Sequence, residues 1–224
     1  MAMTADGKIA TANRVVSTFG SARDHEHLYE LRATADAVMC GARTVETSGT
    51  TLGSGGAKFR RRRLKNGLAE CPLRVLVSGS GSIDPRATIF NQGLASIIIL
   101  TTERVSSKNL EQLSEVADEV KICGKNEVDL PAAVRWLRQK WGVKRLLCEG
   151  GGELNDALFR AGLVDEINLT ICPKIFGGRV APTIAEGQGF AQLALARQYR
   201  FLSLRAIKGE LFTVLLRGKN THPV

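Results

Sequence analysis

Short runs of apolar and β-branched residues alternate with stretches of helical periodicity along most of the chain. Strands are predicted at residues 36–40, 73–78, 96–101, 120–123, 144–148 and 166–171, and residues 2–5 form the end of one more. Helices are predicted at residues 23–34, 107–115, 129–141 and 153–161. This alternation predicts an α/β fold of three layers, in which helices cover both faces of a mainly parallel, twisted sheet.

Two parts of the chain depart from that alternation. Residues 200–207 and 210–217 are strand-like runs joined at Lys208-Gly209, which predicts a C-terminal antiparallel hairpin. Residues 47–71 and 173–190 look like loops, and loops this long in a compact domain usually bind a ligand or are disordered. Because no repeat or linker divides the chain, we expect a single domain over residues 1–224.

Composition excludes several classes of protein. Hydrophobic residues make up 44% of the chain and charged residues 24%, which is typical of a globular protein. The longest apolar run, residues 95–100, is too short to span a membrane, and the first residues lack the plan of a signal peptide. The five cysteines are widely separated and form no CxxC pair, so we expect buried, reduced thiols and no metal site. These features predict a cytoplasmic protein.

The net charge of +9 is compatible with a nucleic-acid surface or with a protein that handles small phosphorylated ligands. Most basic residues are scattered, and only Arg60–Arg63 with Lys65 forms a block. Phe59 is the one aromatic residue beside that block, so nucleic-acid binding is the weaker interpretation.

The strongest local signal is the sequence Glu149-Gly150-Gly151-Gly152, which follows a predicted strand and precedes a predicted helix. Glycines let the backbone approach a diphosphate, and a helix amino-terminus offers free N–H groups and a positive dipole end. A tight turn between strand and helix would explain the glycines equally well. The Glu149 carboxylate would repel a phosphate, so we expect it to face a second ligand.

A second strand ends at Gly41, and Arg43 and Thr44 follow it. Arg43 could pair with a phosphate and Thr44 could donate to one, across the sheet edge from the glycines. Helix capping by Thr44 is an equal alternative. By itself, Asp6-Gly7-Lys8 indicates a turn with a surface lysine.

Taken together, in this order and spacing, these segments resemble the reductase family of riboflavin biosynthesis, which has the dihydrofolate-reductase-like fold. The matching pieces are residues 2–10, 31–33, 36–38, 41–45, 72–75, 149–152 with Leu154, 162–166 and 173–178. They span nearly the whole chain. The family reduces a ribosylaminopyrimidine 5′-phosphate with NADPH and opens the ribose to a ribityl chain, so the resemblance implies this activity and a homodimer.

The resemblance also implies site residues. On the NADP side we expect Ala2, Arg43, Thr44, Ser48, Ser78, Gly150, Gly151, Gly152, Glu153 and Leu154. On the substrate side we expect Lys8, Arg32, Leu52 and Glu149. Glu149 and Asp6 are the candidate catalytic carboxylates, with Glu149 gripping the pyrimidine or ribose and assisting proton transfer. Arg32 and one arginine of Arg60–Arg63 are expected to hold the 5′-phosphate.

The chain departs from the family pattern at several points. Ser48 stands where the family has Asp, and Thr50 where it often has Pro, so the loop that carries Leu52 is expected to run differently. The chain also begins within the family's first strand. The zinc signature of the deaminase module found in many relatives, His-x-Glu with Pro-Cys-x-x-Cys, does not occur in the sequence.

Two other functions stay open from the sequence. A pterin or folate reductase on the same fold would use a carboxylate of the first helix, where Asp24, Glu26 and Glu30 lie. Glu149 and residues 162–166 favour the pyrimidine nucleotide instead. The other alternative is a non-enzymatic module that binds a phosphate ligand or RNA. The sequence does not distinguish the 2,5-diamino substrate from its deaminated form.

Overall fold

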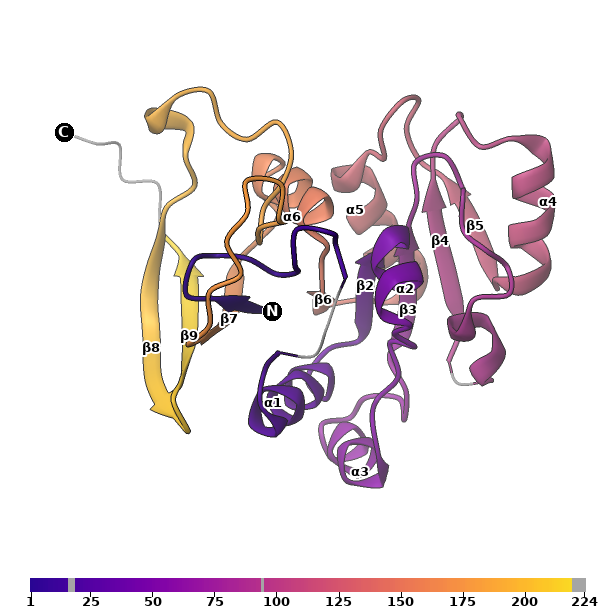
Figure 1. Ribbon diagram of the computed structural model, residues 1–224. Coiled ribbons are helices and arrows are strands. Elements are labelled where there is room, and N and C mark those ends of the chain that lie inside the picture. The colour runs from indigo at the N-terminus through magenta and orange to yellow at the C-terminus, as the bar shows by residue number, and fades with distance from the viewer. Residues whose placement is uncertain (16–18, 94, 219–224) are drawn as a thin grey trace. The chain divides into compact units, whose positions relative to one another are not determined.

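The computed structural model describes residues 1–15, 19–93 and 95–218 of the protein (Figure 1). The chain consists of two compact units, one formed by residues 26–151 and the other by residues 1–25 with 152–224. Among the described residues, no helix is both long enough and apolar enough to cross a membrane.

The first unit is built on a five-stranded sheet in which all strands are parallel (Figure 1). In spatial order the strands are β5 (Glu119–Ile122), β4 (Ile97–Thr101), β3 (Leu73–Val77), β2 (Ala37–Gly41) and β6 (Leu146–Cys148). Their alternating apolar side chains make a dense core with the helices. On one face the core consists of Val38, Cys40, Leu76, Ile97 and Ile99, joined by Val45, Leu52 and Leu113. The carboxyl ends of these strands share one edge of the sheet, where ligands of parallel sheets bind.

Over its described residues this unit contains, wholly or in part, five α-helices: α1 (Ala22–Arg32), which begins in the other unit, α2 (Ala42–Ser48), α3 (Ala57–Lys65), α4 (Ser107–Val116) and α5 (Leu130–Trp141). A 3₁₀ turn covers Thr88–Gln92. The start of α5 is the one that the sequence predicts. The Asp129 carboxylate accepts a hydrogen bond from the Ala132 amide, and Pro131 occupies the first turn. Gly142, with φ of 66°, ends that helix.

Helix α3 corrects the expectation of a continuous loop over residues 47–71. The buried side of α3 is formed by Phe59 and Arg63, which are four residues apart. Because one of these two positions is an arginine, the sequence lacks the apolar periodicity that indicates a helix. The remaining arginines and lysines of the block favour helix formation by their intrinsic propensity.

The second unit contains a four-stranded sheet of mixed direction. In spatial order its strands are β1 (Ala2–Thr4), β7 (Glu166–Cys172), β9 (Glu210–Arg217) and β8 (Tyr199–Ile207). The hairpin of β8 and β9 is confirmed, with positive φ angles at Lys208 and Gly209 that indicate a type I′ turn. The mainly parallel α/β class is also confirmed. However, β1 and β7 pair with the hairpin in a sheet of their own, which the sequence pattern does not predict.

Helix α6 (Gly152–Arg160) and a 3₁₀ turn (Leu193–Leu195) complete the second unit. A side chain at Gly152 would lie 2.6 Å from the Thr183 carbonyl oxygen and 2.9 Å from the Glu186 Cβ atom. The Glu186 amide donates to the Gly152 carbonyl at 2.9 Å. The third glycine of the triplet is therefore required for close packing of residues 183–186 against the start of α6, a structural role that needs no phosphate.

Candidate functional site

The first feature of the candidate site is the contact between the ends of β2 and β6. The Gly41 amide donates to the Gly150 carbonyl at 2.8 Å, and the Glu149 amide donates to the Met39 carbonyl at 2.8 Å. A side chain at Gly151 would lie 3.3 Å from the Thr44 hydroxyl oxygen. The Gly150–Gly151 peptide is cis. The structure thus brings together Thr44 and the glycine loop, as the sequence predicts.

Hydroxyl groups continue along the same edge of the sheet. Ser78 directly follows β3 and is buried, with 8% of its surface exposed. Thr101 and Thr102, at the end of β4, both donate from their hydroxyls to the Gly79 carbonyl, at 3.4 and 2.5 Å. Sequence reasoning missed this threonine pair, although its signal, two hydroxyls at the end of an apolar strand, is present. Both threonines are fully buried and their hydroxyls bond within the fold, so Thr44 and the glycine backbone are the groups that this edge presents for a phosphate or a ribose.

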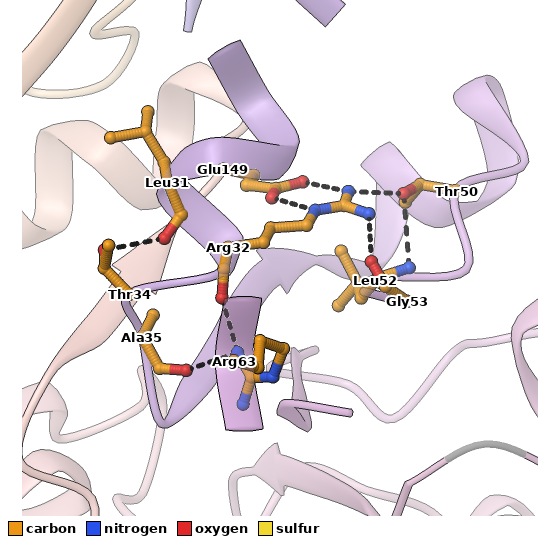
Figure 2. Close-up of polar contacts among 9 residues, drawn as sticks. All are labelled: Leu31, Arg32, Thr34, Ala35, Thr50, Leu52, Gly53, Arg63 and Glu149. Carbon is orange, nitrogen blue, oxygen red and sulfur yellow. Dashed lines mark hydrogen bonds and ion pairs between the residues drawn. The ribbon is translucent and has the colours of Figure 1, made fainter. Parts of the chain in front are cut away.

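The second feature is a buried ion pair between Arg32, the last residue of α1, and Glu149, which follows β6 (Figure 2). The Arg32 Nε and Nη2 atoms donate to the two oxygens of Glu149, both at 2.6 Å. The side chains are only 5% and 11% exposed. This bidentate geometry is the strongest form of arginine–carboxylate pair, and burial shields it from water.

Arg32 is also held from the segment that follows α2. Its Nη1 atom donates to the Gly53 carbonyl at 2.7 Å, and Nη2 approaches the Thr50 hydroxyl at 3.4 Å (Figure 2). The guanidinium lies 5.3 Å from the centre of the Tyr29 ring. Burial acts to lower the pKa of Arg32, but the hydrogen bonds and charge of Glu149 outweigh it and raise that pKa.

The sequence places both residues on the substrate side but does not predict that they pair with each other. Four of the five guanidinium N–H groups of Arg32 are directed to Glu149, Thr50 and Gly53. The expectation that Arg32 holds a phosphate stays a prediction. It would require the guanidinium to use its one remaining N–H group or to exchange a partner.

Leu52 lies beside this pair in an uncommon conformation. Its φ is 52°, in the left-handed region that costs a branched side chain free energy, and its side chain is fully buried in the core. The Leu52 amide approaches the Thr50 hydroxyl at 3.4 Å. A contact between Leu52 and a substrate, which stays a prediction, would therefore be made by its backbone.

The residues after Thr44 are engaged locally. The Ser48 hydroxyl donates to the Thr44 carbonyl at 2.6 Å and accepts from the Thr50 amide at 3.3 Å. Gly49, with φ of 62°, ends α2 there. Ser48 thus stabilises the end of the helix, where the family's Asp would carry a charge. Its contact with a cofactor stays a prediction, as does that of Arg43, whose side chain is exposed.

The arginine block is divided between the two sides of α3. Arg63 is 1% exposed, and its guanidinium donates to backbone carbonyls. Arg60 pairs with Glu70 at 3.4 Å, and Arg62 lies 3.9 Å from Glu30. A phosphate contact from this block could therefore come only from the arginines on its outer side.

The other expected residues lie in the second unit. The Asp6 carboxylate accepts bonds from the Thr4 hydroxyl and from the amides of Phe176 and Gly177, the latter two at 3.2 and 2.7 Å. Lys8 Nζ donates to the Ala181 carbonyl at 3.1 Å. These bonds tie the turn after β1 to the segment after β7.

The remaining three expected cofactor contacts are also placed. Ala2 pairs with Thr170 in the sheet, Leu154 is 8% exposed, and Glu153 lies exposed in the first turn of α6. The roles proposed for these residues, and for Asp6 and Lys8, stay predictions.

Comparisons of sequence and of fold with known proteins find relatives that agree with one another. A family model described as the RibD C-terminal domain matches residues 1–212. The chain is 34% identical over 190 residues to the 2,5-diamino-6-ribosylamino-4(3H)-pyrimidinone 5′-phosphate reductase of Archaeoglobus fulgidus, with 85% of each chain covered. It is 31% identical over 195 residues to the reductase of the same name from Aquifex aeolicus, covering 85% of this chain and 82% of that one. In fold it is similar to a pyrimidine reductase-like protein from Corynebacterium diphtheriae, with a TM-score of 0.85, 22% identity and coverage of 98% and 90%.

The hydrogen bonds of Asp6 predict a pH-dependent contribution to stability. The Thr4 hydroxyl, together with the two amides, holds the pKa of Asp6 below its ordinary value of 3.8, although partial burial acts in the opposite direction. The ionised form therefore stabilises the fold, and this contribution is lost as the pH falls through the lowered pKa.

Asp6→Asn should be less stable than the wild type in urea unfolding at pH 7, and the difference should shrink below pH 3.8. Glu115→Gln, on the exposed side of α4, is the control. A difference that stays constant down to about pH 3, below the ordinary pKa of an aspartate, would show that the charge of Asp6 contributes nothing.

Proposed function

The chain belongs to the RibD C-terminal domain family, and we propose that it reduces 2,5-diamino-6-ribosylamino-4(3H)-pyrimidinone 5′-phosphate with NADPH. It is a reductase of riboflavin biosynthesis, as the sequence predicts. Two relatives that carry this substrate in their names match more than four fifths of the chain. The observation that supports the proposal most directly is the fixed Glu149 carboxylate at the ligand-binding edge of the sheet.

For the cofactor, the residues at the sheet edge fit a dinucleotide. Gly41 and Gly151 present backbone without side chains, and the Thr44 hydroxyl lies beside Gly151. Ser78 directly follows Val77, the residue that pairs with Gly41 in the sheet. NADPH, when bound, supplies the hydride for C1 of the ribosyl group. Arg43, exposed on α2 next to Thr44, is the guanidinium that we propose pairs with the 2′-phosphate and favours NADPH over NADH.

Glu149 is the proposed acceptor for the polar groups of the substrate. Each of its oxygens accepts one bond from Arg32, and a carboxylate oxygen has a second lone pair for a further donor. Those lone pairs suit a ribose hydroxyl or an exocyclic amine. When C1 accepts the hydride, a proton must reach the ring oxygen or the nitrogen, and we propose that Glu149 orients the group that receives it.

The alternatives are less well supported. A pterin reductase would use a carboxylate of the first helix, Asp24, Glu26 or Glu30. Glu26 pairs with Lys58, and Glu30 lies close to His27 and Arg62, which disfavours these two but not Asp24. A non-enzymatic module does not agree with relatives that are named as reductases.

The reaction can be tested by following NADPH oxidation with the 2,5-diamino nucleotide and, separately, with its deaminated form. We expect turnover with the first, and preference for the second would reassign the substrate. Glu149→Gln keeps the shape of the side chain and should lower kcat about 100-fold, the low end of what a positioned acid–base group contributes, because the reaction needs little proton transfer. Glu115→Gln on the exposed side of α4 should leave kcat unchanged. Full turnover by the Glu149 variant would remove Glu149 from the mechanism.

We further propose that a second copy of the chain covers strand β8. This strand lies at the edge of its sheet, and it exposes Phe201 at 64%, Leu202 at 57% and Leu204 at 57%. An edge strand with large exposed apolar side chains invites pairing and is normally covered. A homodimer would remove these side chains from water. The five free cysteines suit the cytoplasm, where thiols stay reduced.

If β8 forms the dimer interface, the double change Phe201→Asp and Leu204→Asp should convert the dimer to a monomer. The physical reason is that each introduced carboxylate would lose its hydration in the interface. Light scattering coupled to size exclusion measures the mass. Ile122→Asp makes the same kind of change on β5, at the edge of the other sheet, and should leave the dimer intact. A wild-type chain that runs as a monomer would contradict the proposal.

A further inference from the structure

Arg63 is a buried cation that the proposed reaction does not use. It lies on the inner side of α3 and is 1% exposed. Its Nη1 atom donates to the Arg32 carbonyl and, at 2.7 Å, to the Ala35 carbonyl (Figure 2). Its Nε atom donates to the Ala69 carbonyl at 2.8 Å. Every acceptor in these bonds is a backbone carbonyl. Burial acts to lower the pKa of Arg63.

Two of these carbonyls, those of Arg32 and Ala35, lie at and just after the carboxyl end of helix α1. Helix α1 ends at Arg32, and the last carbonyls of a helix have no partner within it. A cation at that end also complements the negative end of the helix dipole. Arg63 thus holds the backbone of the residue whose side chain binds Glu149, and it holds Ala35 two residues before β2 begins.

Together with the chain from Gly53 to α3, the contacts of Arg32 and Arg63 form a closed circuit that begins and ends at Arg32. The Arg32 side chain bonds to the Gly53 carbonyl, the chain continues from Gly53 into α3, and Arg63 of α3 returns to the Arg32 backbone (Figure 2). Asn66, just after α3, adds a bond from its side-chain amide to the Ala33 carbonyl at 2.9 Å. Arg32 is therefore fixed at both ends, by Glu149 and Gly53 at the guanidinium and by Arg63 at the backbone.

We propose that Arg63 is a positioning residue, which acts through Arg32 to set the Glu149 carboxylate for the substrate. Its effect on turnover rests on the function proposed above, whereas its effect on Arg32 does not. A shift of about 1 Å in a catalytic group can lower a rate substantially, so the loss of Arg63 should affect the reaction without any direct contact with substrate.

The chain contains a matched control in Arg74 of β3. Arg74 is 3% exposed, and within the described part of the chain its guanidinium also bonds to backbone carbonyls, those of Ile89 and Ala95. Burial lowers its pKa as well. Neither carbonyl belongs to α1, to residues 50–53 or to Glu149. A variant at Arg74 therefore reproduces the loss of a buried, carbonyl-bound arginine without disturbing the circuit.

The experiment compares Arg63→Met, Arg63→Lys and Arg74→Met under conditions where circular dichroism shows each to be folded. The first readout is the ¹⁵N–¹H NMR signal of the Arg32 Nε–H group, assigned by its loss in Arg32→Lys. Because this N–H is buried against Glu149, it should exchange slowly with water in the wild type and in Arg74→Met. In Arg63→Met it should move or broaden away.

The second readout is steady-state kinetics with the pyrimidine nucleotide. Arg63→Met should lower kcat/KM about tenfold, the effect of roughly 1.4 kcal/mol of lost transition-state stabilisation, with NADPH affinity unchanged. Arg63→Lys should recover part of that loss because an ammonium can still donate to the carbonyls. Arg74→Met should match the wild type.

The outcomes separate this inference from the proposed function. A wild-type chain without turnover on either nucleotide would refute the function, and the Nε signal would still decide the role of Arg63. An unchanged signal and unchanged kcat/KM in Arg63→Met would overturn the inference, as would equal losses in Arg74→Met. If Arg63→Met does not fold, Arg63→Lys decides by the same two readouts: intermediate values support positioning, and wild-type values overturn it.

Discussion

The buried pair of Arg32 and Glu149 is the interaction on which the rest of the candidate site depends. It joins the end of α1 to the end of β6, and through Gly53 it fixes the segment that leads to α3. Removing two charges from water is costly, and only a bidentate geometry with further hydrogen bonds offsets that cost. Thr50 and Gly53 supply those bonds at the guanidinium, and Arg63 holds the Arg32 backbone.

This arrangement suits a reaction whose rate depends mainly on how the reacting groups are positioned. Hydride transfer needs two carbons held close together in a defined orientation, and it needs little acid–base chemistry. A carboxylate that is fixed by a buried arginine can orient a polar substrate without moving itself. The family gives the reaction, and the contacts around Glu149 indicate how this chain would hold the substrate for it.

Much of the first unit could be predicted from the sequence because its signals are local. Apolar strands, the Asp129–Pro131 helix start and the glycines after Glu149 each show in a few neighbouring residues. The pairing of Arg32 with Glu149 could not, because it joins residues 117 positions apart. Helix α3 was missed since an arginine replaces an apolar residue on its buried side, and Arg63 finds its acceptors only in the folded chain. The packing role of Gly152 likewise depends on Thr183 and Glu186.

The account is tested most directly by a double-mutant cycle on stability, with Arg32→Met, Glu149→Leu and the two combined. Each single variant leaves one buried charge without its partner and should lower the free energy of unfolding by about 3 kcal/mol. The double variant removes both charges, so its loss should be about 2 kcal/mol or more below the sum of the single losses. Urea unfolding measures all four proteins. Losses that add to within about 0.5 kcal/mol would show that the two side chains do not act as a pair, and would contradict the central claim.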